Sequence, residues 1–224
     1  MEREEIVSIL ETEIANGNIR AGQRLVEIQL IDRFVVARSK IREVMRQLEM
    51  DGFVTIVRNT GAVVTEVTQK DVEHSYDLMG VLEGLSVREA TPYLTFRHFE
   101  EMQKIIDDME ATENPVLLNQ LNDDFHRLLC SLSDNVRLVQ VAHNLRLHLK
   151  RFGSKAFINP YQIGVSRREH RSIITAIREG EPIKAEGLVR SHYITTKNCH
   201  IKSAVIRPPS HVIQETNDLK RTPI

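Results

Sequence analysis

The pattern of apolar and polar residues in the first third of the chain predicts two short helices followed by a β-hairpin. Apolar residues recur first at the spacing of amphipathic helices and then at the two-residue spacing of strands. The predicted elements are a helix over 26–34, a helix over 38–51, and strands over 53–57 and 62–67 around a turn at 58–61. Gly52 is expected to end the second helix. This order is typical of the winged helix-turn-helix, whose second helix lies in the DNA major groove.

The second predicted helix also carries a cluster of basic side chains opposite its apolar stripe. We expect Arg38 and Arg42 to face the DNA groove. Ser39 and Arg46 would support contacts with phosphates. A basic helix face is most often simply solvated, so the prediction of DNA binding depends on the cluster and the hairpin together. The candidate DNA-binding residues are Arg38, Ser39, Lys40, Arg42 and Arg46 on the helix, and Arg58 and Gly61 in the wing.

The residues of this region resemble a known family. The segment LVEIQLIDRFVVARSKIREVMRQLEMDGFV is similar to the pattern LxExxLAxxxGVSRTPVREALRxLxxxGLV of GntR-type bacterial transcription regulators. The resemblance covers 7–67 and includes IANGNIRAG at 14–22. It implies a homodimer that forms largely through a helical domain. One recognition helix reads few bases, so two-fold pairing on a palindromic operator is expected.

Three positions depart from the family pattern. Val35 stands where the family has Gly in the turn, and it could require a changed backbone angle. Ala37 stands where the family has a capping Ser, and losing a side-chain N-cap costs a helix about 1 kcal/mol. Lys40 stands where the family has Pro in the first turn. These departures leave open an interaction module that has lost DNA binding.

After residue 67 the chain shows helical periodicity and almost no strand alternation. Capping-box patterns at 68–71 and 166–169 mark two helix starts, and a looser stretch through Gly164 precedes the second. The predicted helices cover 71–92, 96–111, 115–132, 136–152, 166–180 and 182–206. The fold class is therefore mainly α. The expected domains are a winged helix-turn-helix at 1–67, an all-α six-helix bundle at 68–206 and a mobile tail at 207–224.

Two segments of the helical part resemble the FCD domain, the effector-binding module of the FadR-type branch of GntR regulators. NDDFHRLLCSLSDN at 122–135 is similar to DxxFHxxLxxxSGN. REHRSIITAIREGEPIKAEGLVRSH at 168–192 is similar to EHxxIxxAIxxGDxxxAxxxxxxH. The count of six helices is closest to the VanR-like group. The resemblance implies a ligand-responsive regulator that senses a small metabolite, expected to bear a carboxylate.

Three of the nine histidines could form a buried metal site from different helices of the bundle. His126 lies four residues after Asn122, so both project from one face of a helix. His170 is expected in the first turn of the fifth helix of the bundle and His192 midway along the sixth. Imidazole nitrogens suit zinc, nickel and related ions. The alternative is that each histidine caps or hydrogen-bonds a group in the core.

The resemblance favours the metal site, with Asn122, His126, His170 and His192 as ligands. Many FCD proteins have Asp at the position of Asn122, and Asn offers only a neutral carbonyl oxygen. Asp123 is next to it but points away and is a poor substitute.

Candidate effector-binding residues are Arg146, Met79 and Tyr76. An inward-facing Arg146 could bind an effector carboxylate through two hydrogen bonds, whereas Arg151 is expected to be an exposed charge. Met79 falls near the position of an Arg that reaches the effector in FCD relatives. Glu83 matches a frequent family Glu and is expected to be a structural partner for another helix.

Composition adds little support for DNA binding, since 30 Lys and Arg against 31 Asp and Glu leave a formal net charge of -1 in 224 residues. The basic signal is local. Cys130 and Cys199 lack metal-type spacing, and the acidic start resembles neither a signal peptide nor a membrane span. A cytoplasmic, non-enzymatic transcription regulator without a membrane partner is expected. The rival from another class is a metal-dependent enzyme whose histidine cluster activates water.

Overall fold

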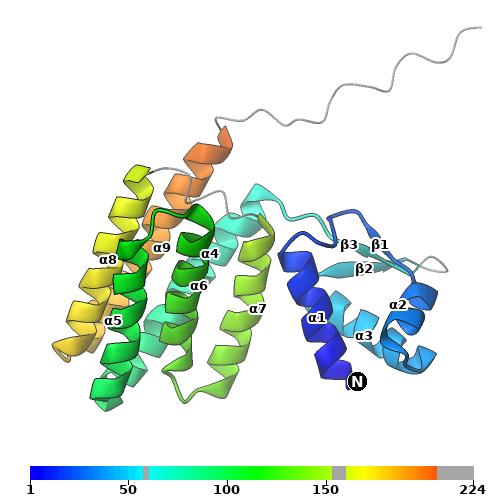
Figure 1. Cartoon of the computed structure of the whole chain (residues 1–224), viewed down its shortest axis with the longest axis horizontal. Helices are drawn as coiled ribbons and strands as arrows, with labels where there is room; N and C mark the ends of the chain where they lie inside the picture. The colour runs from blue at the N-terminus through cyan, green and yellow to red at the C-terminus, as the bar shows by residue number, and fades with distance from the viewer. Residues whose placement is uncertain (58–60, 153–159, 206–224) are drawn as a thin grey trace, which may run out of the picture.

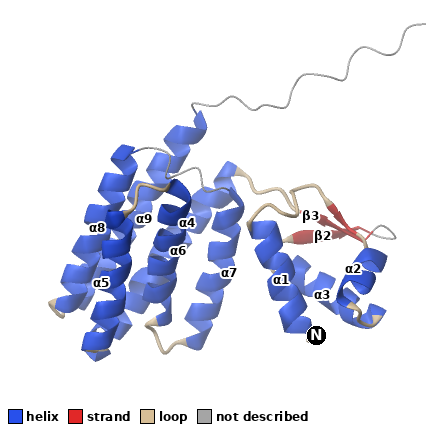
Figure 2. Cartoon of the chain, viewed as in Figure 1, coloured by secondary structure: helices blue, strands red, loops and turns tan. Residues whose placement is uncertain are grey.

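The computed structural model describes residues 1–57, 61–152 and 160–205. Their order confirms the predicted mainly α fold, with a small sheet near the start and helices beyond it (Figure 2). The elements are α1 (Arg3–Ala15), β1 (Arg24–Leu25), α2 (Glu27–Phe34), α3 (Arg38–Met50), β2 (Val54–Val57), β3 (Gly61–Val64), α4 (Gln69–Ala90), the 3-10 turn η1 (Thr91–Tyr93), α5 (Phe96–Ala111), α6 (Pro115–Ser131), α7 (Val136–Phe152), α8 (Pro160–Arg178) and α9 (Pro182–Val205). We call the part up to β3 the head and the part from α4 onward the bundle.

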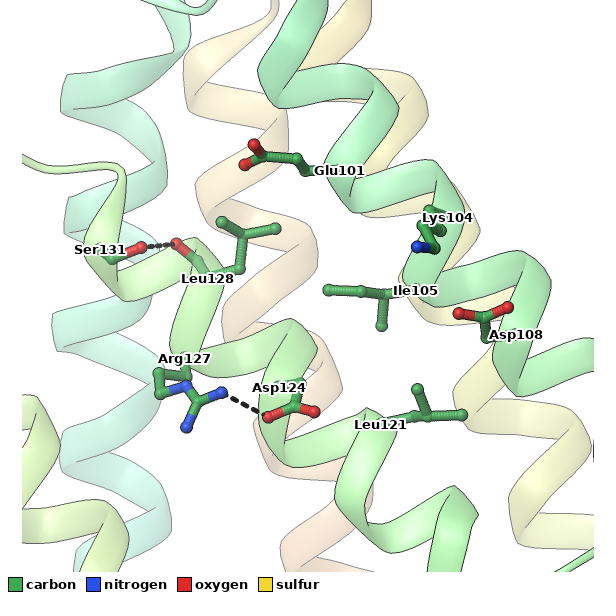
Figure 3. A pocket seen from close by; sticks show the side chains of 9 residues that line it. All are labelled: Glu101, Lys104, Ile105, Asp108, Leu121, Asp124, Arg127, Leu128 and Ser131. Atoms are coloured by element: carbon green, nitrogen blue, oxygen red, sulfur yellow. Dashed lines mark hydrogen bonds and ion pairs between the residues drawn. The ribbon is translucent and has the colours of Figure 1, made fainter.

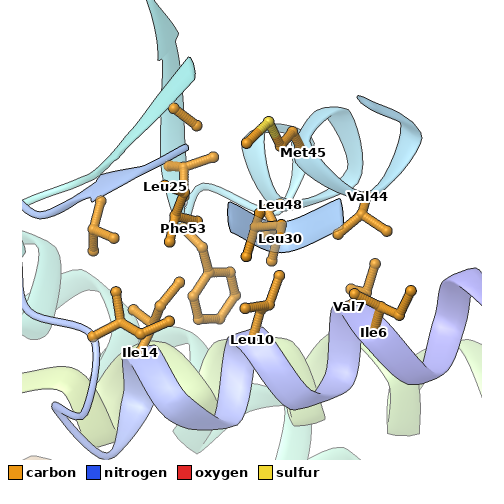
Figure 4. Packing of buried hydrophobic residues seen from close by; sticks show 14 of the residues in the cluster. Ile6, Val7, Leu10, Ile14, Leu25, Leu30, Val44, Met45, Leu48 and Phe53 are labelled. Atoms are coloured by element: carbon orange, nitrogen blue, oxygen red, sulfur yellow. The ribbon is translucent and has the colours of Figure 1, made fainter. Parts of the chain in front are cut away.

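The head is held together by an aliphatic core beneath a three-stranded sheet. The strand order is β1-β3-β2, and both pairings are antiparallel. Figure 4 shows side chains of α1, α2 and α3 meeting around Phe53, which is fully buried. The alternation of the hairpin predicted β2 and β3, but it did not predict β1. Two residues are too few to show an alternation, and β1 is defined by its distant partner β3.

The tight connection between α2 and α3 keeps the geometry expected of a glycine although it holds a valine. Val35 adopts φ 52° and ψ 53°, in the left-handed region. A β-branched residue rarely occupies this region, because its Cβ approaches the neighbouring carbonyl. The changed backbone angle suggested by the sequence is therefore not seen. Ala37 begins α3 without a side-chain cap.

The wing depends on a glycine at the start of β3. A Cβ atom on Gly61 would lie 2.5 Å from the carbonyl oxygen of Leu25 in β1, and the residue has φ 99°. No other residue type fits both conditions without moving the backbone. Gly61 therefore allows β1 to pair with β3. Arg58, the other predicted wing residue, lies outside the described residues, as does the predicted tail at 207–224.

The bundle consists of α4 to α9, which confirms the predicted six helices within the described ranges. Long helices α4 and α9 pack against each other along much of their length, with α7 and α6 against α4 and α8 against α9 (Figure 1). Gly80 and Gly84 of α4 allow this approach, because a Cβ at either position would lie 3.2 Å from a side-chain atom of α9. The predicted capping box at 68–71 is present at Thr68.

The predicted start of α8 was wrong. The helix begins at Pro160, six residues before the expected start, and it continues through Gly164. Proline suits the first turn of a helix, and one glycine costs an interior only about 1 kcal/mol. His170 consequently lies well inside α8 and not in its first turn. His192 lies near the middle of α9, as predicted.

Head and bundle meet where α1 lies beside α7 (Figure 1). Leu147 of α7 joins the apolar cluster of the head. The Nε2 atom of His148 lies 2.6 Å from the carbonyl oxygen of Asp51, and its ring packs on Phe53 with centroids 4.4 Å apart. One helix of the bundle therefore contributes to the core of the head.

No described helix is both long and apolar enough to cross a membrane.

Candidate functional site

The exposed face of α3 carries the candidate DNA-binding residues. Ile41, Val44, Met45 and Leu48 are buried against the head, as the helical period predicts. Ser39 and Arg46 are exposed, and the side chains of Arg38 and Arg42 are 67% and 57% exposed. Four polar side chains therefore point to solvent from one helix of the winged fold.

One carboxylate of α2, that of Glu27, accepts hydrogen bonds from both Arg38 and Arg42. Arg38 Nε donates to Glu27 at 2.8 Å, and Arg42 Nε donates to the other oxygen of Glu27 at 3.1 Å. These hydrogen bonds lower the pKa of Glu27, with that from Arg38 contributing most. Lys40 turns away from this group, because its amine donates to the carbonyl oxygen of Met1 at 3.0 Å. Of the predicted basic residues, Arg38 and Arg42 are thus the pair held side by side.

Three histidines converge inside the bundle, as predicted. His126 of α6, His170 of α8 and His192 of α9 each offer a ligand atom, and these atoms lie within 4.8 Å of one another. All three side chains are buried. The Nε2 atoms of His126 and His192 are 3.1 Å apart, and those of His170 and His192 are 3.3 Å apart.

Two of these rings contact a carboxylate through Nδ1, the nitrogen on the side away from the cluster. His126 Nδ1 lies 2.6 Å from an oxygen of Glu83, and His192 Nδ1 lies 2.8 Å from an oxygen of Glu169. An Nδ1–H that donates to a carboxylate leaves Nε2 as an unprotonated acceptor in a neutral imidazole. Burial, followed by the charge of His192, holds the pKa of His126 and of His170 well below the ordinary value, so both rings are neutral near pH 7.

This arrangement suits a cation between the Nε2 atoms. Two Nε2 lone pairs that face each other at 3.1 Å repel, and they need either a proton or a metal ion between them. Two nitrogens bound to one tetrahedral zinc ion at about 2.0–2.1 Å are expected about 3.3–3.4 Å apart. The separation of 3.3 Å matches this spacing, and that of 3.1 Å is slightly shorter. The donor set and its spacing therefore fit a divalent metal.

Asn122, the predicted fourth ligand, adds a related observation. Its Oδ1 atom is buried and has no hydrogen-bond partner among the described residues. An oxygen in that position is normally satisfied by a donor or a cation. Asp123 does not join the cluster and instead forms ion pairs with Lys150 at 2.5 Å and Arg146 at 3.7 Å. This agrees with the prediction that Asp123 points away from the site.

Glu83 is the centre of a buried polar network behind the metal candidates. Its carboxylate, fully buried, accepts from Arg146 at 2.8 Å and from the Tyr193 hydroxyl at 2.9 Å, besides its contact with His126. Burial raises the pKa of Glu83, and the charge of Arg146 and the hydrogen bond from Tyr193 oppose that effect. Glu83 is thus a partner for three other helices, as its predicted structural role required.

A cavity of about 680 Å³ extends from the histidine cluster toward the head. It is of the size that small-molecule sites usually have. Its inner wall includes Asn122, His126, Arg146, His192, Tyr193 and Tyr76. Tyr76 and Arg146, two of the three candidate effector-binding residues, therefore line this cavity. Met79 does not, because it is fully buried in the core of the bundle on the inward side of α4.

Figure 3 shows a second hollow, of about 610 Å³, between α5 and α6. Its charged side chains are partly neutralised by an ion pair between Arg127 and Asp124 at 2.6 Å. It is an open groove without a histidine or a buried polar group among its lining residues. The cavity at the histidine cluster is therefore the better candidate for a ligand site.

Arg151 differs most from its prediction. It was expected to be an exposed charge, but it is only partly exposed and lies at the joint between bundle and head. It lines the same cavity, and it donates to the carbonyl oxygen and hydroxyl of Thr65. Its position beside the head could not be seen in the sequence, since the docking of α7 on the head is a long-range contact. Glu169 was also missed as a functional residue, because its spacing from Ser166 was interpreted as a capping box.

Comparison with known proteins gives a consistent identity. The model of the bacterial regulatory proteins of the gntR family matches residues 2–64, and the FCD domain model matches residues 74–195. The chain is 30% identical over 216 residues to the HTH-type transcriptional regulator YdhC of Bacillus subtilis (strain 168), covering 92% of this chain and 90% of that protein. It is 23% identical over 192 residues to the HTH-type transcriptional repressor RspR of Escherichia coli (strain K12), covering 84% of each.

A solved structure supports the same fold. E. coli McbR/YncC superposes with a TM-score of 0.74 at 16% identity, over 92% of this chain and 98% of that one. The families and relatives that match are transcription regulators, so the alternative of a metal-dependent enzyme is not supported. The chain belongs to the GntR family and is a DNA-binding transcription regulator whose winged helix-turn-helix is followed by an FCD effector-binding domain.

Proposed function

We propose that this regulator senses a small organic acid through a divalent metal ion held by His126, His170 and His192, with Asn122 as a fourth ligand. The observation that carries the proposal is the pair of facing Nε2 atoms 3.1 Å apart, on rings whose Nδ1 atoms are committed to carboxylates. A zinc or nickel ion, or a similar one, suits these donors. When bound, it would supply a Lewis-acidic position for a carboxylate oxygen of the effector.

The neutral ligand set favours an anionic effector. Three neutral imidazoles and one neutral carboxamide leave the charge of a divalent ion uncompensated, so an incoming carboxylate supplies the missing negative charge. Tyr76 and Arg146 line the same cavity and are proposed to contact the effector. Glu83 and Glu169 position His126 and His192 and do not contact it.

DNA binding is assigned to the exposed face of α3 and the wing. We propose that Arg38 and Arg42 read the major groove, that Ser39 and Arg46 support phosphate contacts, and that Gly61 brings the wing to the backbone. Lys40 is retained as a proposed DNA contact on sequence grounds alone, since its amine donates to the carbonyl oxygen of Met1 here. Arg58 is retained as a proposed wing contact on sequence grounds alone. A homodimer would bind the two halves of a palindromic operator.

The remaining proposals concern the cellular location, the domain boundary and the coupling mechanism. We propose a cytoplasmic location, because a bacterial DNA-binding regulator acts where the chromosome lies. The division at residue 67 stays a prediction, supported by separate apolar clusters in the head and the bundle. The mechanism would be linkage, in which the effector binds one arrangement of the sensor domains more tightly and thereby changes the spacing of the two heads.

The proposal can be tested on full-length protein purified without chelators. Elemental analysis should find about one divalent metal ion per chain, and light scattering at micromolar concentration should give the mass of a dimer. Organic acids should change the affinity for the upstream region of its own gene in a gel shift. Protein without metal, whose DNA affinity responds to no organic acid, would refute the sensing role but not the DNA-binding role.

A further inference from the structure

The candidate effector cavity is not made by the bundle alone. Besides the histidine cluster, its lining includes residues 15–17, where α1 of the head ends, and Arg151 near the end of α7. The inner end of the cavity is therefore the proposed metal site, and its outer wall belongs to the DNA-binding head. A ligand long enough to extend from the cluster would reach the joint between the two parts.

Arg151 is unlike the other cations that line this cavity. Arg146 is paired with Glu83 at 2.8 Å, Lys150 with Asp123 at 2.5 Å, and Arg127 with Asp124 at 2.6 Å. No carboxylate lies within ion-pair distance of Arg151 in the part of the chain that the structure describes. Its partners are neutral: the carbonyl and hydroxyl of Thr65, the ring of His148 and the face of Phe53.

The surroundings make this unpaired charge costly. Arg151 is partly buried, and burial lowers its pKa, which shows that its charged form is poorly compensated. A guanidinium binds a carboxylate through two charge-assisted hydrogen bonds, which are about twice as strong as those to neutral acceptors. An anionic group that enters the cavity would therefore compete well with Thr65 for Arg151.

We propose that the effector carries a second anionic group, which binds Arg151 at the outer end of the cavity and takes it from Thr65 of the head. This inference depends on the proposed metal-and-carboxylate site at the inner end. The first anionic group binds at the histidine cluster and the second at Arg151, so a dicarboxylate is the simplest ligand class. Loss of the Thr65 contact loosens the head from α7, and the end of α1 senses the ligand directly.

The proposed coupling between ligand binding and the position of the head must act in both directions. If the ligand weakens the contact between Arg151 and the head, then a head held away from α7 on DNA must favour the ligand by the same factor. Coupling of this kind typically changes an affinity about 5- to 150-fold. Arg151 would then determine both which acids bind and whether binding reaches the DNA-binding head.

Calorimetric titration of full-length, Zn²⁺-loaded protein tests the proposal with acetate and with linear dicarboxylates from malonate to adipate. At least one dicarboxylate should bind about 10-fold or more tightly than acetate. In Arg151→Gln this advantage should fall below about twofold, while the affinities for Zn²⁺ and acetate stay unchanged and show that the bundle is folded. Lys150→Gln, next in the chain and also lining the cavity, is the matched control and should keep the advantage.

A fluorescence reporter tests the wall made by the head. The chain contains no Trp, so Asn16→Trp, at an exposed position that lines the cavity, supplies a single emitting group. Its emission should shift when the tight dicarboxylate binds. Met50→Trp, at a residue 81% exposed on the head, should stay unchanged.

The outcomes separate the two proposals. Binding of Zn²⁺ and acetate without any dicarboxylate advantage, an advantage that survives in Arg151→Gln, or a silent Trp at position 16 each overturn the role of Arg151 and α1 alone. Wild-type protein that binds neither Zn²⁺ nor any carboxylate removes the proposed sensing site, and this inference falls with it.

Discussion

The cores of the head and the bundle are built on different principles. The buried cluster of the head is aliphatic apart from Phe34, Met45 and Phe53. Among the described residues, Glu11 is the one buried charged or polar side chain of the head, whereas the bundle buries nine of the ten such residues. The head is thus stabilised by apolar packing. The bundle contains buried polar groups, and burying them lowers the stability that apolar packing alone would provide. Buried polar groups of this kind are the reason for proposing a ligand site in the bundle.

Among substitutions of the buried polar residues, we expect the largest effect from those in the histidine cluster. His170→Ala or His192→Ala removes one of three imidazole donors, and we expect metal uptake to be abolished because two donors and a neutral carboxamide bind weakly. Elemental analysis and Zn²⁺ calorimetry measure the loss. His74→Ala, at an exposed histidine of α4, is the control and should retain full uptake. DNA binding by the unliganded variants should survive, and its loss would show that the head depends on the cluster.

The second prediction compares one buried residue from each core. Glu83→Ala leaves Arg146 without its buried partner, so the free energy of unfolding of the bundle should fall by about 3–5 kcal/mol. The volume-conserving change Leu48→Met in the head should cost less than about 1.5 kcal/mol. Denaturant titration of both variants gives the two values.

A further change separates the charge from the packing. Adding Arg146→Met to Glu83→Ala removes the unpaired cation and should restore part of the stability. If the single and double variants lose the same free energy of unfolding, Glu83 acts through packing and not through its charge. The contrast between the two cores would then weaken.

The third prediction concerns the surface of the head. Arg42→Ala should cost about 1–3 kcal/mol of specific DNA affinity if its side chain reads a base edge. Gel shifts with the cognate site and with an unrelated duplex distinguish base reading from phosphate contact. Arg20→Ala, at an exposed arginine of the head outside α3, is a control of equal charge change. Unchanged binding by Arg42→Ala would exclude Arg42 from the interface.

The smallest effect comes from the buried acid of the head. Burial and the charge of Asp51 raise the pKa of Glu11 to about 7. The folded head therefore holds a proton on Glu11 that the unfolded chain releases above its ordinary pKa of 4.5. Stability from this group is fully present below pH 4.5 and is lost as the pH rises through 7.

Thermal or denaturant unfolding at pH 5 and pH 8 tests the pH effect. The free energy of unfolding of the wild type relative to that of Glu11→Gln should fall by about 1–2 kcal/mol between these values, allowing for partial solvent screening. A difference that does not change with pH would show that Glu11 titrates normally.

The two regions also differed in how far the sequence predicted them. In the head the helix period, the stop at Gly52 and the hairpin alternation are local, so α2, α3 and β2 were predicted to within one residue at each end. The predicted strand over 62–67 extends three residues beyond the end of β3 at Val64. In the bundle the three histidines were identified through motifs. Their convergence depends on how α6, α8 and α9 pack, and periodicity does not specify that packing.

The wrong start of α8 shows where local patterns mislead. Ser166 and Glu169 have the spacing of a capping box, but both lie inside the helix. Ser166 is buried with its hydroxyl 3.5 Å from His170, and Glu169 positions His192. A short polar motif can therefore indicate a helix terminus or a functional site, and tertiary contacts decide which.

Glu27 has a consequence for how the protein finds its operator on a chromosome. A searching regulator encounters far more unrelated sequence than operator, and its time on unrelated sequence is governed by contacts between arginines and phosphates. Because Arg38 and Arg42 each already bind Glu27, a phosphate must compete with that carboxylate for them. If both arginines read base edges as proposed, encounters with unrelated DNA would be brief, and only an operator that offers base edges to the free ends of both guanidinium groups would hold the protein for long.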